Sequence, residues 1–135
     1  MSYPTALERC GYNNVTTLDI RGDSLAEIKT DYLTWTPDKD YNVIITNPPF
    51  KLAREIIEKA LDDVVDGGFV IMLLRLNFFG SQSRFDMWTN QLPKYCFVHH
   101  KRMSFLDSGG TDSIEYCHMV FQKGHYSDFT KLKVI

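Results

Sequence analysis

Several features that would assign this chain to a specialised class of protein are missing from its sequence. The longest apolar run, 69–74, is far shorter than the roughly 20 residues that a membrane-spanning helix needs. The chain does not open with a basic segment followed by an apolar one, which is the pattern of a signal peptide. Its three cysteines are widely spaced and odd in number, which suits a reducing compartment better than a disulfide framework. We therefore expect a cytoplasmic protein with no membrane partner.

Excess charge and clustered metal ligands are missing as well. The formal net charge is −2, which excludes a protein that coats nucleic acid through a general excess of basic residues. His99 and His100 are adjacent, so in a strand they would point to opposite faces and could not chelate one ion. We expect no metal site.

The length of 135 residues is typical of one domain with its own core, and we predict a single domain over 1–135.

What the sequence does contain is an alternation of apolar strands and helical segments. Short apolar runs bounded by turn residues predict strands over 15–20, 41–46, 69–74, 95–100 and 114–121. Helical structure is expected over 4–11, 24–29, 51–65 and part of 78–91. The apolar stripe is clearest in 51–65, and the glycines of Asp66-Gly67-Gly68 are expected to end that helix. This order predicts an α/β sheet, mainly parallel, with an antiparallel hairpin at its C-terminal end.

The sequence Asn47-Pro48-Pro49-Phe50 stands between the predicted strand 41–46 and the predicted helix 51–65. Loops at the carboxyl ends of the strands of such sheets bind ligands. Two successive prolines fix the backbone and remove two N–H donors, so the turn is rigid and its carbonyls are left without local partners. An amide, a rigid backbone and an aromatic ring would thus be presented together. The alternative is a simple connecting turn with Phe50 in the core.

In this setting the tetrapeptide resembles the catalytic motif of S-adenosylmethionine-dependent amino-methyltransferases, the family that includes the DNA N6-adenine and N4-cytosine enzymes. Together with the segments 31–35 and 73–79, it is most similar to DNA adenine methyltransferases of phage or prophage type. The resemblance covers nearly the whole chain from about Val15 onward. It implies a Rossmann-like class I methyltransferase sheet, S-adenosylmethionine as cofactor, DNA as partner, and a bacterial or phage-infected cell.

The resemblance also implies a catalytic role for each residue of the motif. An exocyclic amine is a poor nucleophile because its lone pair is delocalised into the ring. The Asn47 side-chain oxygen and the Pro48 carbonyl would accept its two hydrogens and free that lone pair. Pro49 would keep the turn rigid, and Phe50 would stack on a base flipped out of the duplex. The methyl group would then pass directly from the sulfonium to N6, with no covalent enzyme intermediate.

Further site residues follow from the same resemblance. Asp19, with its neighbour Ile20, would accept hydrogen bonds from the cofactor's ribose hydroxyls at a strand end. Asp31 would accept from the cofactor's adenine amino group, with Tyr32 and Leu33 covering the ring. For both aspartates a capping or turn role is the alternative. The residues that could contact DNA are Arg75, Asn77, Arg84, Lys101 and Arg102. Each of them, taken singly, is better explained as a surface residue.

One part of the family's pattern is missing. The cofactor-binding glycine loop follows the family's first strand, and no strand with a Gly-rich turn precedes Val15. We therefore expect an N-terminally truncated or minimal sheet, whose uncovered edges could pair with a second copy of the chain. Three hypotheses follow: a DNA adenine-N6 methyltransferase, an RNA or protein-glutamine methyltransferase, and a module that binds DNA or protein without catalysing.

Overall fold

The computed structural model describes residues 3, 14–19, 26–101 and 114–135. The chain divides into two compact units, Met1–Lys39 and Asp40–Ile135. Two of the predicted site residues, Ile20 and Arg102, lie outside the described residues, and so does the predicted helix over 4–11. The expectation that 1–135 forms one domain stays a prediction.

In the first unit, two short strands pair in parallel. β1 (Leu18–Asp19) lies beside β2 (Ile28–Lys29), with Leu18 opposite Ile28 and Asp19 opposite Lys29. A 3-10 turn, η1 (Tyr32–Thr34), follows β2. The prediction of a helical turn over 24–29 is wrong for Ile28 and Lys29, because pairing with β1 draws them into a strand. This is a non-local contact that local propensity does not report.

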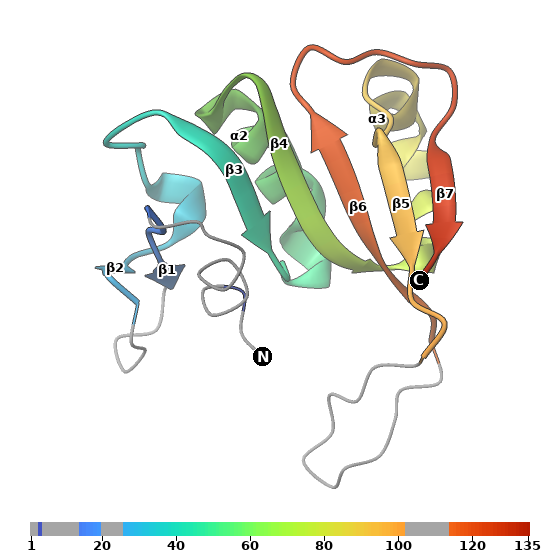
Figure 1. Ribbon diagram of the computed structural model, residues 1–135, viewed down its shortest axis with the longest axis horizontal. Helices are drawn as coiled ribbons and strands as arrows, with labels where there is room; N and C mark the ends of the chain where they lie inside the picture. The colour runs from blue at the N-terminus through green and yellow to red at the C-terminus, as the bar shows by residue number, and fades with distance from the viewer. Residues whose placement is uncertain (1–2, 4–13, 20–25, 102–113) are drawn as a thin grey trace, which may run out of the picture. The chain divides into compact units, whose positions relative to one another are not determined.

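In the second unit, the described residues form one sheet of five strands in the order β3-β4-β6-β5-β7. Its strands are β3 (Tyr41–Thr46), β4 (Val64–Arg75), β5 (Tyr95–Val98), β6 (Tyr116–Gln122) and β7 (Lys131–Val134). All of these except β6 run in the same direction, and β6 lies antiparallel between β4 and β5 (Figure 1). The β5–β6 pair is the predicted antiparallel hairpin. The edge strand β7 was not predicted, because its exposed Lys-Leu-Lys-Val sequence has no long apolar run.

Helices α2 (Ala53–Asp63) and α3 (Phe85–Asn90) lie against the same face of this sheet (Figure 1). The buried stripe of α2 consists of Ala53, Ile56, Ile57 and Ala60, which is one face of a helix. The sheet contributes alternate residues of its central strands to the core: Val70, Met72 and Leu74 from β4, and Cys117, Met119 and Phe121 from β6. Both described cysteines, Cys96 and Cys117, are buried.

The predicted end of the helix is wrong. α2 stops at Asp63, and the next residue, Val64, already pairs with Tyr41 in the sheet. The Lys123 ammonium donates to the carbonyls of Asp62 and Val64, at 3.1 and 3.0 Å, and so binds the end of the helix. Gly67 and Gly68 therefore lie within β4, where the register with β3 shifts.

The parallel pairing of β3 and β4 determines where the motif lies. Thr46, the last residue of β3, is opposite Met72, so the chain leaves both strands at the same edge of the sheet. Beyond β4 come two 3-10 turns, η3 (Leu76–Phe79) and η4 (Gln82–Arg84). No helix among the described residues is both long and apolar enough to cross a membrane.

Candidate functional site

The Asn47-Pro48-Pro49-Phe50 turn leaves the carboxyl end of β3 and opens η2 (Phe50–Leu52), which runs into α2. Pro49 precedes η2 with φ −56°, and its carbonyl accepts from the Leu52 N–H at 3.0 Å. Pro48 is buried, whereas Asn47 is exposed. Within the described residues, no donor is bonded to the Asn47 side chain or to the Pro48 carbonyl. Two neighbouring acceptors are thus available to a ligand.

The ring of Phe50 is half-exposed, with 49% of its surface accessible, so the alternative of a core residue does not hold. Its inner side meets Phe78 edge to face, with ring centroids 6.2 Å apart. Phe78 is buried and makes a second edge contact, at 5.7 Å, with Trp88 of α3. Phe50 is therefore anchored by Phe78, while about half of its surface stays accessible to a stacking partner.

Arg84 holds its guanidinium beside this ring. Its Nε donates to the Phe78 carbonyl at 2.8 Å, and its guanidinium carbon lies 4.2 Å from the centroid of the Phe78 ring. The distance to the Phe50 centroid is 5.6 Å. No partner of the two terminal nitrogens is found in the described part of the chain. A planar cation is thus fixed next to the exposed aromatic ring.

A second arginine ties α2 to the segment that follows β4. Arg54 donates to Asp86 through both terminal nitrogens, at 3.1 and 2.8 Å, and to the Ser83 carbonyl at 2.7 Å. Its Nε donates to Glu58 at 2.8 Å. The hydrogen bonds from Arg54 lower the pKa of Asp86 below its ordinary value. Arg54 and Asp86 consequently neutralise each other, which leaves neither free to pair with a ligand.

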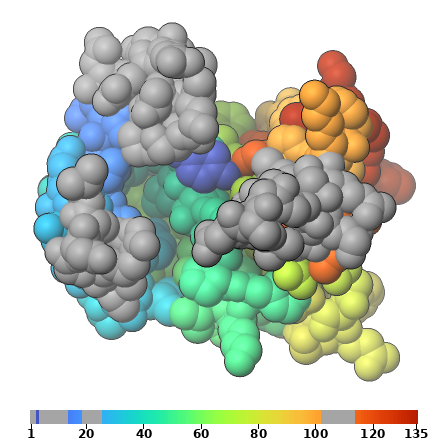
Figure 2. Space-filling model, turned by 90° about the horizontal axis from the view of Figure 1, so that it is seen from below, coloured from blue at the N-terminus to red at the C-terminus, as the bar shows by residue number. Residues whose placement is uncertain are grey.

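These residues surround a depression of about 250 Å³, lined by Phe50, Lys51, Arg54, Glu55, Phe78, Ser83 and Arg84. Figure 2 views the molecule from the side toward which β3 and β4 point, and there the green surface of the segment after β3 lies beside the yellow surface of the segment after β4. The sequence prediction missed most of this lining. Only Phe50 and Arg84 were among the predicted site residues.

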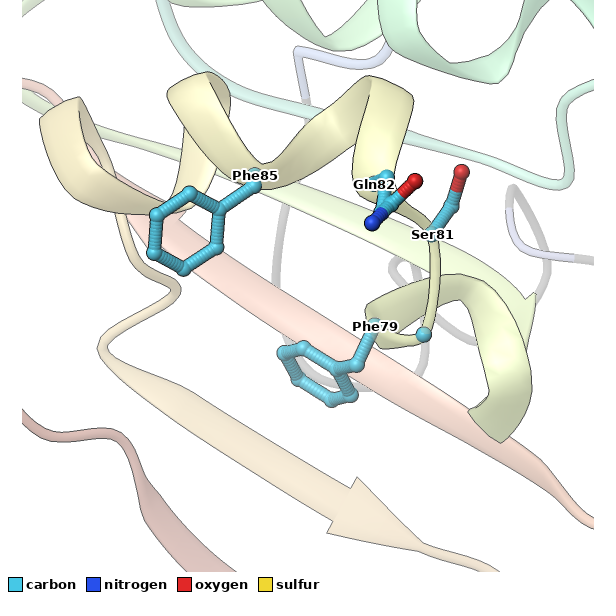
Figure 3. A pocket seen from close by; sticks show the side chains of 5 residues that line it. Phe79, Ser81, Gln82 and Phe85 are labelled. Atoms are coloured by element: carbon cyan, nitrogen blue, oxygen red, sulfur yellow. The ribbon is translucent and has the colours of Figure 1, made fainter.

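A second, shallower depression of about 700 Å³ lies further along the same segment and is lined by Phe79, Gly80, Ser81, Gln82 and Phe85. Phe79 and Phe85 turn their rings to the same side, and the Ser81 hydroxyl points away from them (Figure 3). No titratable residue is among those that line it, so it offers an apolar surface and no obvious chemistry.

The predicted cofactor residues belong to the first unit. Asp19 ends β1, and Asp31 follows β2 by two residues, so both leave the carboxyl edge of this parallel pair. One carboxylate oxygen of Asp31 caps η1 by accepting from the Leu33 N–H at 3.0 Å. Tyr32 and Leu33 form η1 itself. The capping alternative is therefore realised for Asp31, and cofactor binding by these residues stays a prediction.

The remaining predicted DNA contacts that the structure describes, Arg75, Asn77 and Lys101, are not among the residues that line the depression. Arg75 is half-buried and its Nε lies 3.4 Å from the Tyr116 hydroxyl, while Asn77 in η3 and Lys101 are exposed.

His99 Nε2 and His118 Nδ1 are hydrogen-bonded at 2.7 Å. In the described ranges, no three histidine, cysteine or acidic residues are placed to hold a metal ion.

Comparisons with known proteins give similarity at the level of structure. No protein-family model and no curated protein matches the sequence. A solved structure from Listeria monocytogenes, assigned to the class I S-adenosylmethionine-dependent methyltransferases, is similar with a TM-score of 0.57 at 12% identity. The match covers 80% of this chain and 41% of that one, so this chain spans less than half the other's length. It confirms the predicted fold class, a mixed α/β sheet of the Rossmann-like kind.

A complex of M1.HpyAVI with S-adenosylmethionine also matches, with a TM-score of 0.39 at 18% identity. That match covers 70% of this chain and 56% of the other.

Proposed function

We propose that this chain is an S-adenosylmethionine-dependent methyltransferase, or the catalytic half of one, that acts on the N6 amino group of adenine in DNA. The observation that carries the proposal is the pair of unbonded acceptors, the Asn47 side chain and the Pro48 carbonyl, next to the half-exposed ring of Phe50. The sheet resembles that of a class I methyltransferase, and the motif lies at the carboxyl end of its strand β3.

The chemistry that this arrangement supports is the activation of a planar amino group. Two acceptors that bind both hydrogens draw the nitrogen toward tetrahedral geometry, so its lone pair becomes available for attack. Because the prolines hold the turn rigid, the acceptors need little reorganisation during the reaction. Phe50 supplies a stacking surface for a base that has left the duplex.

S-adenosylmethionine would supply the sulfonium methyl group. Asp19 is the last residue of β1, and Asp31 follows β2 by two residues. Acidic residues at or just after a strand end can accept hydrogen bonds from the ribose hydroxyls and the amino group of such a cofactor. Of the Asp31 carboxylate, only Oδ1 is used in capping η1 within the described residues. We assign Asp19, Ile20, Asp31, Tyr32 and Leu33 to cofactor binding as part of the proposal.

The substitution Asn47→Ala tests the proposed function. We expect the transfer of tritiated methyl groups to adenine-containing DNA to fall roughly 100-fold or more, because one preorganised hydrogen-bonding group is lost. Asn42→Ala is the matched control, since Asn42 is an exposed asparagine near the start of β3, the strand that leads into the turn. Circular dichroism verifies that both variants fold. Undiminished transfer by Asn47→Ala would contradict the proposal.

A binding module without catalysis is the second candidate. The observation that favours it is that one carboxylate oxygen of Asp31, a residue assigned to the cofactor, already accepts from the Leu33 N–H at 3.0 Å. Calorimetry with S-adenosylmethionine separates the two candidates, because only a methyltransferase has to bind the cofactor. The same methyl-transfer assay with RNA, and with a glutamine-containing peptide, tests the other substrates that a planar-amine site could accept.

A further inference from the structure

We propose that Arg84 binds the phosphate of the nucleotide whose base stacks on Phe50. The inference rests on the proposed function of the turn, and it assigns a substrate class to the depression between α2 and η4. The phosphate of a nucleotide could pair with the guanidinium of Arg84, whereas the neutral amide side chain of a protein substrate offers no charge for it to pair with.

The first argument is the preorganisation of Arg84. Its Nε bond to the Phe78 carbonyl, at 2.8 Å, and its position 4.2 Å from the Phe78 ring centroid fix the plane of the guanidinium. The Nε–H is used, and the two terminal nitrogens have no partner in the described residues. A guanidinium held in this way offers a fork of donors that matches two phosphate oxygens.

The second argument is that the carboxylate nearest to Arg84 in the sequence is occupied. Asp86 lies two residues beyond Arg84, and both of its oxygens accept hydrogen bonds from Arg54. Glu55 also lines the depression, and no ion pair between it and Arg84 exists within the described residues. Among the residues that line the depression, Lys51, Arg54 and Arg84 are positive and Glu55 is negative. Asp86 and Glu58, which both accept from Arg54, are not part of this lining. The charge of the lining favours an anion.

The third argument is the spacing of the two groups. The guanidinium carbon lies 5.6 Å from the centroid of the Phe50 ring. In a nucleotide, a single sugar separates the base from its phosphate, so one ligand can reach both groups only where ring and cation are neighbours. Phe50 and Arg84 meet that condition, whereas Arg75, Asn77 and Lys101 are not part of this depression.

A purely structural role for Arg84, as a brace of the turn between η3 and η4, is the competing explanation. Two ligands separate the explanations: 2′-deoxyadenosine 5′-monophosphate, which carries a phosphate, and 2′-deoxyadenosine, which does not. Dissociation constants for both are measured by NMR titration at low salt. The variants are Arg84→Gln, Arg84→Lys and the control Lys133→Gln, which removes one charge from the exposed edge strand β7.

We expect Arg84→Gln to weaken the monophosphate roughly tenfold to a hundredfold, because charge-assisted hydrogen bonds are lost, and to leave the nucleoside unchanged. Arg84→Lys keeps the charge and loses the fork, so it should fall between Arg84→Gln and the native chain. Lys133→Gln should bind both ligands as the native chain does. Equal weakening of both ligands by Arg84→Gln, or no weakening of either, would overturn the inference. So would a native chain that binds neither ligand at millimolar concentration.

The results for Asn47→Ala and Arg84→Gln together distinguish failure of the proposed function from failure of the phosphate site. If Asn47→Ala retains methyl transfer while Arg84→Gln selectively loses the monophosphate, the proposed role of the turn falls and the phosphate site stands. If Asn47→Ala loses transfer while Arg84→Gln binds the monophosphate normally, the proposed function stands and the phosphate site falls.

Discussion

Phe50 and Phe78 meet edge to face, with ring centroids 6.2 Å apart and planes at 83°. Phe50 follows β3 and Phe78 follows β4, so this single contact joins the chain segments that leave two adjacent parallel strands. Phe78 is 1% exposed, which makes it the fixed partner, while Phe50 keeps about half of its surface for a ligand. The geometry of the motif therefore depends on a residue outside the tetrapeptide.

Removal of the exposed ring should affect binding more than folding. A base that stacks on an aromatic side chain gains about 1–3 kcal/mol, so Phe50→Ala should weaken the binding of an adenine-containing oligonucleotide roughly 5- to 150-fold. Fluorescence anisotropy with a labelled single strand measures this effect. Phe85→Ala is the control, because Phe85 is also exposed (67%) but lines the other depression. Equal losses from the two substitutions would show that Phe50 has no special role.

The Arg54–Asp86 pair should behave as a coupled unit that stabilises the arrangement of α2 and α3. Thermal unfolding of Arg54→Met, Asp86→Asn and the double variant gives a double-mutant cycle. We expect the double variant to unfold close to the temperature of Arg54→Met, because that single change already removes both bonds to Asp86 together with those to Ser83 and Glu58. The coupling should weaken at high salt, since both groups are solvent-accessible. Strictly additive effects would contradict this prediction.

Glu58 offers an internal comparison for the same cycle. It contacts Arg54 through Nε alone, at 2.8 Å, and lies one turn away on the same helix. Glu58→Gln should therefore lower the unfolding temperature less than Asp86→Asn does.

Local sequence patterns were sufficient to predict the elements that carry the motif. β3 spans Tyr41–Thr46 as predicted, and the tetrapeptide connects it to a helix with the predicted apolar stripe. These features depend on residues that are neighbours in sequence, so composition and spacing report them. The antiparallel hairpin of β5 and β6 was predictable for the same reason, although its insertion next to β4 was not.

What could not be predicted depends on contacts between distant residues. Arg54 and Asp86 are separated by 32 residues, and neither is unusual in its local sequence. The end of α2 was misplaced because Val64 pairs with Tyr41 and Lys123 binds the last carbonyls, and both partners are remote in sequence. A glycine pair is a strong local signal for a helix end, and here these tertiary contacts overrode it.

The same glycines give a stability prediction. A methyl group on Gly68 would come within 2.8 Å of the Val65 carbonyl oxygen and 2.9 Å of the Asn42 carbonyl oxygen, and neither backbone can move without disturbing the β3–β4 pairing. We expect Gly68→Ala to lower the free energy of unfolding by about 1–3 kcal/mol, measured by urea denaturation. Gly67 has φ +78° and open space around it, so a side chain there meets no steric clash but is strained by the left-handed backbone, and Gly67→Asn should destabilise less than Gly67→Ala. A Gly68→Ala variant as stable as the native chain would refute the steric argument.

The hydrogen-bonded pair His99 and His118 should make stability depend on pH near neutrality. Burial, and then the neighbouring His99, lower the pKa of His118 below its ordinary value of 6.5. The folded chain therefore takes up this proton less readily than the unfolded chain. As the pH falls below about 6.5, the unfolded state binds this proton more strongly than the folded state does. The contribution of His118 to the free energy of unfolding is therefore fully present above that pH and is lost as the pH falls further.

Thermal unfolding between pH 7.5 and 5.5 (a window chosen as roughly one unit either side of the ordinary histidine pKa) measures this dependence. We expect the unfolding temperature of the native chain to fall toward the acidic end, and His118→Gln to flatten the curve. His100→Gln is the control, because the His100 ring is exposed and bonds only to the Ile135 carbonyl within the described residues. His99→Gln should raise the pKa of His118 toward its ordinary value, because a neighbouring charge is removed, and NMR titration of the His118 ring reports it. An unchanged pH profile in His118→Gln would show that other groups cause the acid sensitivity.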